Sequence, residues 1–192
     1  TRSHSFVFLN ATDSLDLGGS LTISGSNSTM SISGPIGSTL TYSGSTANTF
    51  ASHTTVTGST LILDKSGTVD AISATKAGSI IVNGGGTLEL MGRGEQISDA
   101  AGLGLSLGGN GGTTTTGGTF EMNGFTETVD RGISAMNGNG VVHSTGGGGL
   151  LIWNSTATGG TSGVLTATGT GNEIDVDLQL TTLASRNNGS VD

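Results

Sequence analysis

The stretch GSTLIL, from Gly58 to Leu63, has a glycine, two small hydroxyl residues and then leucines at alternate positions. Glycine takes up turn conformations at little cost, and a period of two is typical of a strand with one buried face. Related phrases begin at Gly19 (GSLTI), Gly37 (GSTLTY), Gly78 (GSIIV), Gly86 (GTLEL), Gly118 (GTFEM), Gly140 (GVVH) and Gly163 (GVLTA). This pattern predicts many short strands separated by tight turns.

The spacing of the phrases indicates how these strands are arranged. Several steps between copies are about 20 residues long, which is typical of solenoids in which each coil stacks on the one before. We therefore predict an all-β fold, a parallel β-helix (β-solenoid) of about nine coils of roughly 20 residues. It would occupy residues 1–192 as a single domain. The alternative is a β-sandwich, although the chain has only 4% aromatic residues and one proline.

The composition excludes several classes of function. The net charge is −8, and the 6 Lys and Arg residues are scattered, so no basic patch is available for nucleic acid. With 0 cysteines the chain has neither disulfides nor thiolate metal sites. The sequence has no apolar run of the roughly 18 residues that a transmembrane helix needs, so we expect no membrane insertion. The Gly-rich stretch from Gly108 to Gly118 (GGNGGTTTTGG) is expected to be a loop inserted into one coil, near 108–118.

Part of the chain resembles the autotransporter-associated β-strand repeats of large bacterial surface proteins. The matching stretches are TTVTGSTLILDKSG (Thr54 to Gly67), GSIIVNGGGTLELMGRGEQISD (Gly78 to Asp99), LGLSLGG (Leu103 to Gly109) and GGTFEMNGFTETV (Gly117 to Val129). The resemblance implies a right-handed β-helix, secretion across the bacterial envelope and display at the cell surface. Since the chain begins at Thr1 without a methionine, we expect a processed piece or fragment of a longer secreted protein.

Three acidic residues near the C-terminus, Glu173, Asp175 and Asp177, alternate along one expected strand from Ile174 to Leu180. We interpret them as outward-facing carboxylates that keep a weakly charged rod soluble and discourage edge pairing. The alternative is a Ca²⁺ site, because calcium prefers hard oxygen ligands. No other cofactor is expected.

Two further carboxylate pairs bear on catalysis. Glu121 lies near Glu127 in the sequence, and Asp13 lies near Asp16. A glycoside hydrolase needs two carboxyl groups roughly 5–10 Å apart across the scissile bond. Solubilising carboxylates are the preferred interpretation here as well, and we predict no catalytic residues.

The remaining polar and aromatic residues suggest no site of their own. The histidines His4, His53 and His143 stand alone, without a metal-binding partner at HxH or HExxH spacing. Threonines at 54, 55 and 57, at 113–116, and at 166, 168 and 170 suggest a flat hydroxyl face of the kind found in ice-binding solenoids. They do not recur at the coil period, so this face is not expected. The single tryptophan, Trp153, is predicted to lie in the core or at an end cap.

These observations favour a non-catalytic structural or adhesive β-solenoid, located outside the cell or on its surface. The two ends of a solenoid carry unpaired N–H and C=O groups, so end-to-end self-association of copies is expected. One alternative is an adhesin module that binds a surface glycan or a receptor through the 108–118 loop or an exposed aromatic residue. Another is a β-helix enzyme that degrades polysaccharide.

Overall fold

A computed structural model describes residues 3–67, 69–72, 80–91, 96–97, 105–108, 116–123, 127–129, 133–137, 139–144, 150–153, 167–168, 173–175 and 177–180. For residues 24–27, 50–52, 127–129, 133–137, 150–153 and 167 onwards it describes the backbone only. These residues form the strands β1 to β17 and include no helix.

The strands make three sheets in which all the pairings are parallel. The first sheet contains β1 (Ser3–Val7), β3 (Thr22–Ser33), β5 (Thr49–Thr57), β7 (Ile80–Asn83), β9 (Leu105–Leu107), β12 (Ile133–Asn137) and β15 (Ala167–Thr168). The second contains β2 (Ser14–Leu17), β4 (Thr39–Gly44), β6 (Thr60–Lys65), β8 (Thr87–Leu90), β10 (Thr119–Met122), β13 (Val141–Ser144) and β16 (Glu173–Asp175). The third contains β11 (Glu127–Val129), β14 (Leu150–Trp153) and β17 (Asp177–Leu180).

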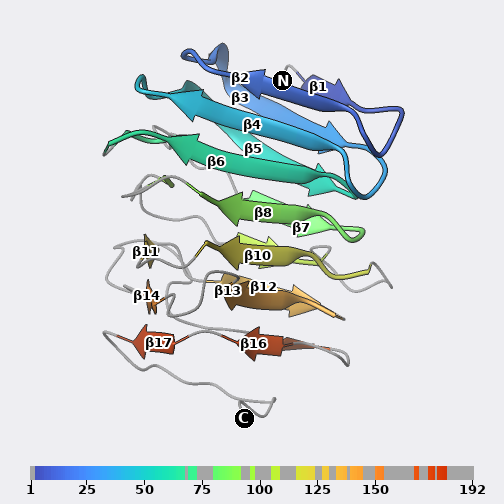
Figure 1. Ribbon diagram of the computed structural model, residues 1–192, viewed down its shortest axis with the longest axis vertical. Helices are drawn as coiled ribbons and strands as arrows, with labels where there is room; N and C mark the ends of the chain where they lie inside the picture. The colour runs from blue at the N-terminus through green and yellow to red at the C-terminus, as the bar shows by residue number, and fades with distance from the viewer. Residues whose placement is uncertain are drawn as a thin grey trace.

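The chain winds as a β-solenoid. Each coil supplies one strand to the first sheet and then one to the second, and Figure 1 shows these layers stacked from the N-terminal to the C-terminal end. About four turns, β1/β2 to β7/β8, are described with few gaps, and later strands extend both sheets to seven strands. Because neighbouring coils pair in parallel, the fold is a stack of coils, and the antiparallel β-sandwich considered as the alternative is wrong.

The predicted count of nine coils is not supported. In register, one turn of the second sheet runs from Leu40 to Leu61 and the next from Leu61 to Leu88, which are intervals of 21 and 27 residues. The prediction failed because the glycine phrase marks strands of both sheets. The copy at Gly19 leads into β3 of the first sheet, whereas the copy at Gly37 leads into β4 of the second, within the same coil. Some of the steps between phrases are therefore shorter than a coil, and a coil length taken from them is too short.

A third side of the solenoid connects each second-sheet strand to the next first-sheet strand. In the early coils β3 and β5 cover both this side and the first sheet, and their register shifts between Ile23 and Ser28. The strand β3 is thus one element that contributes to both sides. In later coils the third side is a separate sheet, seen beside the other two in Figure 1. The strand β12 was not predicted, and the strand expected from Ile174 to Leu180 is divided between β16 and β17.

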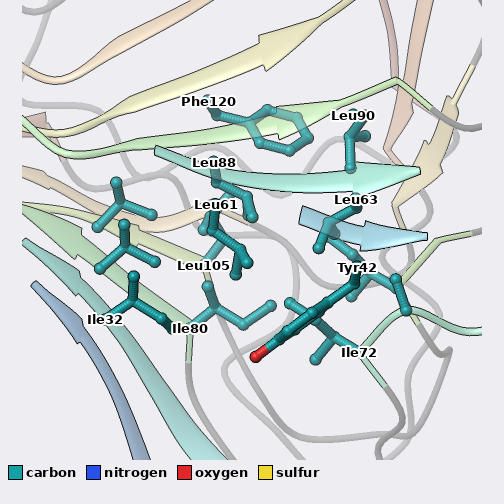
Figure 2. Close-up of a cluster of buried hydrophobic side chains, with 14 of the residues drawn as sticks. Ile32, Tyr42, Leu61, Leu63, Ile72, Ile80, Leu88, Leu90, Leu105 and Phe120 are labelled. Atoms are coloured by element: carbon teal, nitrogen blue, oxygen red, sulfur yellow. The ribbon is translucent and has the colours of Figure 1, made fainter. Parts of the chain in front are cut away.

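The core is made of apolar columns that run along the axis. Alternate residues of successive second-sheet strands fall in register and are fully buried, as are their counterparts in the first sheet, and Figure 2 shows part of this cluster. The second-sheet columns are Leu40, Leu61, Leu88, Phe120 and Val142, and Tyr42, Leu63, Leu90 and Met122; one first-sheet column is Ile32, Val56, Val82 and Leu107. Burying each such side chain contributes roughly 1.5–3 kcal/mol. Burial also raises the pKa of the Tyr42 phenol above its usual range.

Glycines at the corners let successive coils stack closely. Gly44, with a φ of 85°, lies so close to the Gly18 carbonyl that a Cβ would collide with its oxygen. Gly58, with a φ of 73°, meets the Gly34 carbonyl in the same way. Both the positive φ and the contact with backbone require glycine, so these corners explain part of the glycine content.

Candidate functional sites

The calcium candidate is not a set of residues on one strand. Glu173 and Asp175 belong to β16 of the second sheet, whereas Asp177 begins β17 of the third. Their side chains lie outside the described part of the structure. Among the residues that are described, no group of three or more His, Cys, Asp or Glu side chains is placed to hold a metal ion.

The two carboxylate pairs considered for catalysis are also separated. Glu121 lies on β10 of the second sheet and Glu127 on β11 of the third. The Asp13 carboxylate accepts hydrogen bonds from the backbone N–H groups of Leu9 and Asn10, at 3.0 and 2.9 Å, and so closes the turn before β2. These bonds, led by those from Asn10, lower the pKa of Asp13. Asp16 instead accepts a 2.6 Å hydrogen bond from the Ser43 hydroxyl of the next coil.

Glu121 has different neighbours from those expected. Parallel register places it between Glu89 of β8 and His143 of β13, on the outer face of the second sheet. The His143 Nε2 atom lies 3.7 Å from a Glu121 carboxylate oxygen. Burial, and then the Glu121 carboxylate, raise the pKa of Glu89. We call Glu89, Glu121 and His143 the acid column.

The acid column could have been found in the sequence. Glu89, Glu121 and His143 occupy the same position of the phrase in GTLEL, GTFEM and GVVH. Once those copies are assigned to one sheet, the three residues must stack. Separation along the sequence, from position 89 to position 143, concealed this relation because each residue looked isolated.

A second group of polar side chains, Asn48, Lys65 and Gln96, lies inside the solenoid where the second sheet meets the third side. We call it the polar seam. Asn48 accepts a hydrogen bond from Leu21 N–H at 2.9 Å and donates one to the Ala71 carbonyl at 2.7 Å. Its amide therefore joins the coils before and after it, in place of a backbone pairing.

The other two members of the polar seam bind one another. The Gln96 amide accepts from Lys65 N–H at 2.9 Å and donates to the Lys65 carbonyl at 3.0 Å. The Lys65 ammonium donates to the carbonyls of Gly19 and Ser43, each at 2.6 Å, and the side chain is fully buried. Burial lowers the pKa of Lys65, and the Asp16 carboxylate opposes that shift.

Hydroxyl residues form outward columns, although the threonines considered for a flat face are separated. Thr54 is buried, and Thr57 donates a 2.6 Å hydrogen bond to Asn83 of the next coil. One column lies on the second sheet, where the residues in register are Ser14, Thr39, Thr60, Thr87 and Thr119. The neighbouring positions include Ile62 and Glu89, so no double row of threonines results. Residues 113–115, 166 and 170 lie outside the described part.

The N-terminal face of the solenoid is an open edge. β1 and β2 are the outermost strands of the first and second sheets, and no described strand pairs with their outer edges. Core columns run out at this face, where Leu15 is 38% exposed and Phe6 is only partly buried. Val7, at 63% exposed, adds to the apolar surface of β1.

The other predicted contact residues are placed only in part. His4 and His53 lie on β1 and β5 of the first sheet, opposite Met30 and Thr29 in register. Trp153 ends β14, between Val129 and Leu180, and its side chain is not described. Residues 109–115 of the expected loop lie outside the described part of the chain.

No protein-family model matches the chain, and no curated protein or solved structure matches it. Within the described residues, no helix has the length and apolar character to cross a membrane.

Proposed function

We propose that the chain is a non-catalytic structural module, a right-handed β-solenoid that extends end to end in a rod outside the bacterial cell or on its surface. The observation that carries this proposal is the open edge at β1 and β2, where the apolar core continues to the face of the solenoid without a covering strand among the described residues. Right-handedness is the usual hand of parallel crossovers. The resemblance to autotransporter-associated repeats supports the location.

A second copy of the chain is the proposed neighbour. In the last described coil, Ala167 of β15 follows the core position of Met136, and Ile174 of β16 follows that of Val142. These positions continue the columns that begin at Phe6 and Leu15. A copy stacked on β1 and β2 would thus extend both columns and pair the open edges, as strand addition does in other assemblies.

In such a rod, the hydrogen bonds that hold the coils together run along the axis. Parallel backbone hydrogen bonds join each coil to the next, so a pulling force along the axis loads many bonds together. Side chains add to these links, because Thr22 and Thr49 hydroxyls lie 2.9 Å apart and the Ser43 hydroxyl donates to Asp16. The proposed role of the molecule is therefore mechanical support, which needs no catalytic residue.

Negative-stain electron microscopy over a concentration series tests the proposal. We expect wild-type protein to form rods that lengthen with concentration, and Leu15→Lys to keep them short, since a charge on an edge strand blocks pairing. Ile36→Lys is the matched control, because Ile36 is 74% exposed in the turn between β3 and β4 and should not affect length. Short wild-type rods of uniform length at every concentration would contradict end-to-end joining.

A binding module is the second candidate. It is favoured by two exposed side chains on neighbouring turns, Leu9 at 81% and Ile36 at 74%. Those turns stack, because Gly34 and Gly37 lie against Phe8 and Ala11. Such a patch suits a protein receptor, and loss of cell adhesion in a Leu9→Ser/Ile36→Ser variant, with rod length unchanged, would support this candidate.

A further inference from the structure

The acid column brings ionisable side chains of three successive coils next to one another. Glu89, Glu121 and His143 are consecutive in the parallel register of β8, β10 and β13. Adjacent strands lie about 4.8 Å apart, so the two carboxylates are stacked at close range. Like charges directly opposite one another destabilise a sheet. Among the described residues, the only basic side chain in this column is His143, whose Nε2 lies 3.7 Å from a Glu121 carboxylate oxygen.

Few other charged groups face this column. On the β6 side, Glu89 is opposite Ile62, with Asp64 two positions farther along the same strand. On its own strand Glu89 is flanked by Thr87 and, beyond Leu90, by Met91. Beyond His143 the register continues to β16, with Glu173 opposite Val141 and Asp175 opposite His143. Among the described residues, carboxylates thus outnumber basic side chains along this face, and no lysine or arginine is in register with the column.

Proton binding relieves the repulsion within the column. A protonated Glu89 carries no charge and can donate a hydrogen bond to Glu121. This bond favours closer association of the coils of β8 and β10, and the contact between Glu121 and His143 continues the link to β13. The hydrogen bond cannot form in the unfolded chain, where the residues are far apart.

The direction of the pH effect follows from Glu89. Its folded pKa lies above the ordinary value of 4.5, first because of burial and then because of Glu121. The folded chain therefore binds this proton more tightly than the unfolded chain. The unfolding free energy consequently rises as the pH falls through the folded pKa toward the unfolded value, and the gain is lost again as the pH rises.

We propose that Glu89, Glu121 and His143 form a proton-operated clasp that holds the coils of β8, β10 and β13 more tightly in mildly acidic solution than at neutral pH. The clasp is a property of one chain, so it stands whether or not copies join end to end. A molecule in an acidified environment would gain rigidity in the coils of β8, β10 and β13.

Hydrogen exchange followed by mass spectrometry, with intrinsic rates corrected for pH, tests the clasp. In the wild type, protection of peptides covering β8, β10 and β13 should rise several-fold between pH 7.5 and pH 5. A shift of one pKa unit corresponds to a tenfold change. In Glu89→Gln, protection should already be high at pH 7.5 and should change less with pH.

Asp64→Asn is the matched control, since it removes one carboxylate from the same face of the second sheet without touching the column. It should keep the wild-type pH response. An unaltered pH response in Glu89→Gln overturns the proposal, as does weaker protection of that variant than of the wild type at pH 7.5. An equal rise in peptides covering β3 and β5 also overturns it, because the effect would then belong to the whole chain.

Discussion

Lys65 shows how a single residue can join several coils. It is the charged side chain that the described core encloses, and its ammonium bridges the carbonyls of Gly19 and Ser43 at the ends of two earlier turns. The Gly19 carbonyl lies just after the end of β2, and the Ser43 carbonyl lies near the end of β4, where the regular backbone pairing of the second sheet stops. A cation reaching back along the axis satisfies them, and Gln96 satisfies the backbone of Lys65 itself.

Replacing Lys65 with methionine should destabilise the fold. The volume is nearly kept, but two partly buried carbonyls lose their donor, which costs about 1.5–3 kcal/mol for bonds to a charged group. Urea unfolding at pH 7.5 measures the loss. Lys65→Arg keeps the charge and should recover part of it; equal stability of the methionine variant and the wild type would contradict the bridging role.

The Lys65 bridge also predicts a pH dependence. Burial lowers the folded pKa of Lys65 below its ordinary value of 10.5, so the unfolded chain holds this proton more tightly. The contribution of Lys65 to the unfolding free energy therefore increases as the pH rises through the folded pKa toward 10.5. The wild type should gain stability relative to Lys65→Met across that interval, and a falling difference would contradict the assignment.

At the scale of the element, the strand ends depend on glycine for two separable reasons. Gly44 ends β4 with a positive φ and lies against the Gly18 carbonyl, whereas Gly67 has a φ of 80° and open space around its Cα. Gly67→Ala should therefore cost only about 1–2 kcal/mol for the left-handed backbone. Gly44→Ala should cost clearly more, because a coil must also move. Thermal unfolding compares the two, and equal losses would show that close stacking contributes nothing.

Strands of the second sheet were well predicted from the sequence, whereas the polar contacts of the third side were not. In GSTLTY, GSTLIL and GTLEL the leucines that alternate are the ones that become buried, so pattern and packing agree. On the third side, Asn48 and Gln96 replace apolar residues, because side-chain amides take over backbone pairing. The local sequence does not indicate that amides occupy these positions, because the backbone groups that they bind belong to other coils.

The acid column illustrates the same limit between elements. Each of its residues was visible in the sequence, but which of them become neighbours depends on the register between coils. That register depends on turn lengths, and these vary from a two-residue connection at Gly58 and Ser59 to the long segment between β9 and β10. A period averaged over the chain could not recover it.

At the scale of the whole molecule, the register identifies which segment is one coil. Removing residues 40–60 takes out one turn and leaves Thr39 followed by Leu61, which occupies the place of Leu40. This variant should fold as a shorter solenoid with a cooperative thermal transition. Removing residues 19–36, the interval between two copies of the phrase, joins two second-sheet segments without a first-sheet strand and should not fold. Circular dichroism distinguishes them, and equal behaviour would contradict the register.

Unequal turns also bear on how such a chain can change over generations. A coil keeps its place through a few inward side chains, while its connections vary from the two residues Gly58 and Ser59 to the long segment between β9 and β10. Gene segments that encode whole coils can therefore be duplicated or lost, and corners can acquire new peptide, without redesign of the rest. The length of the solenoid can thus change when coils are added. Its exposed surface can change independently when corners are enlarged.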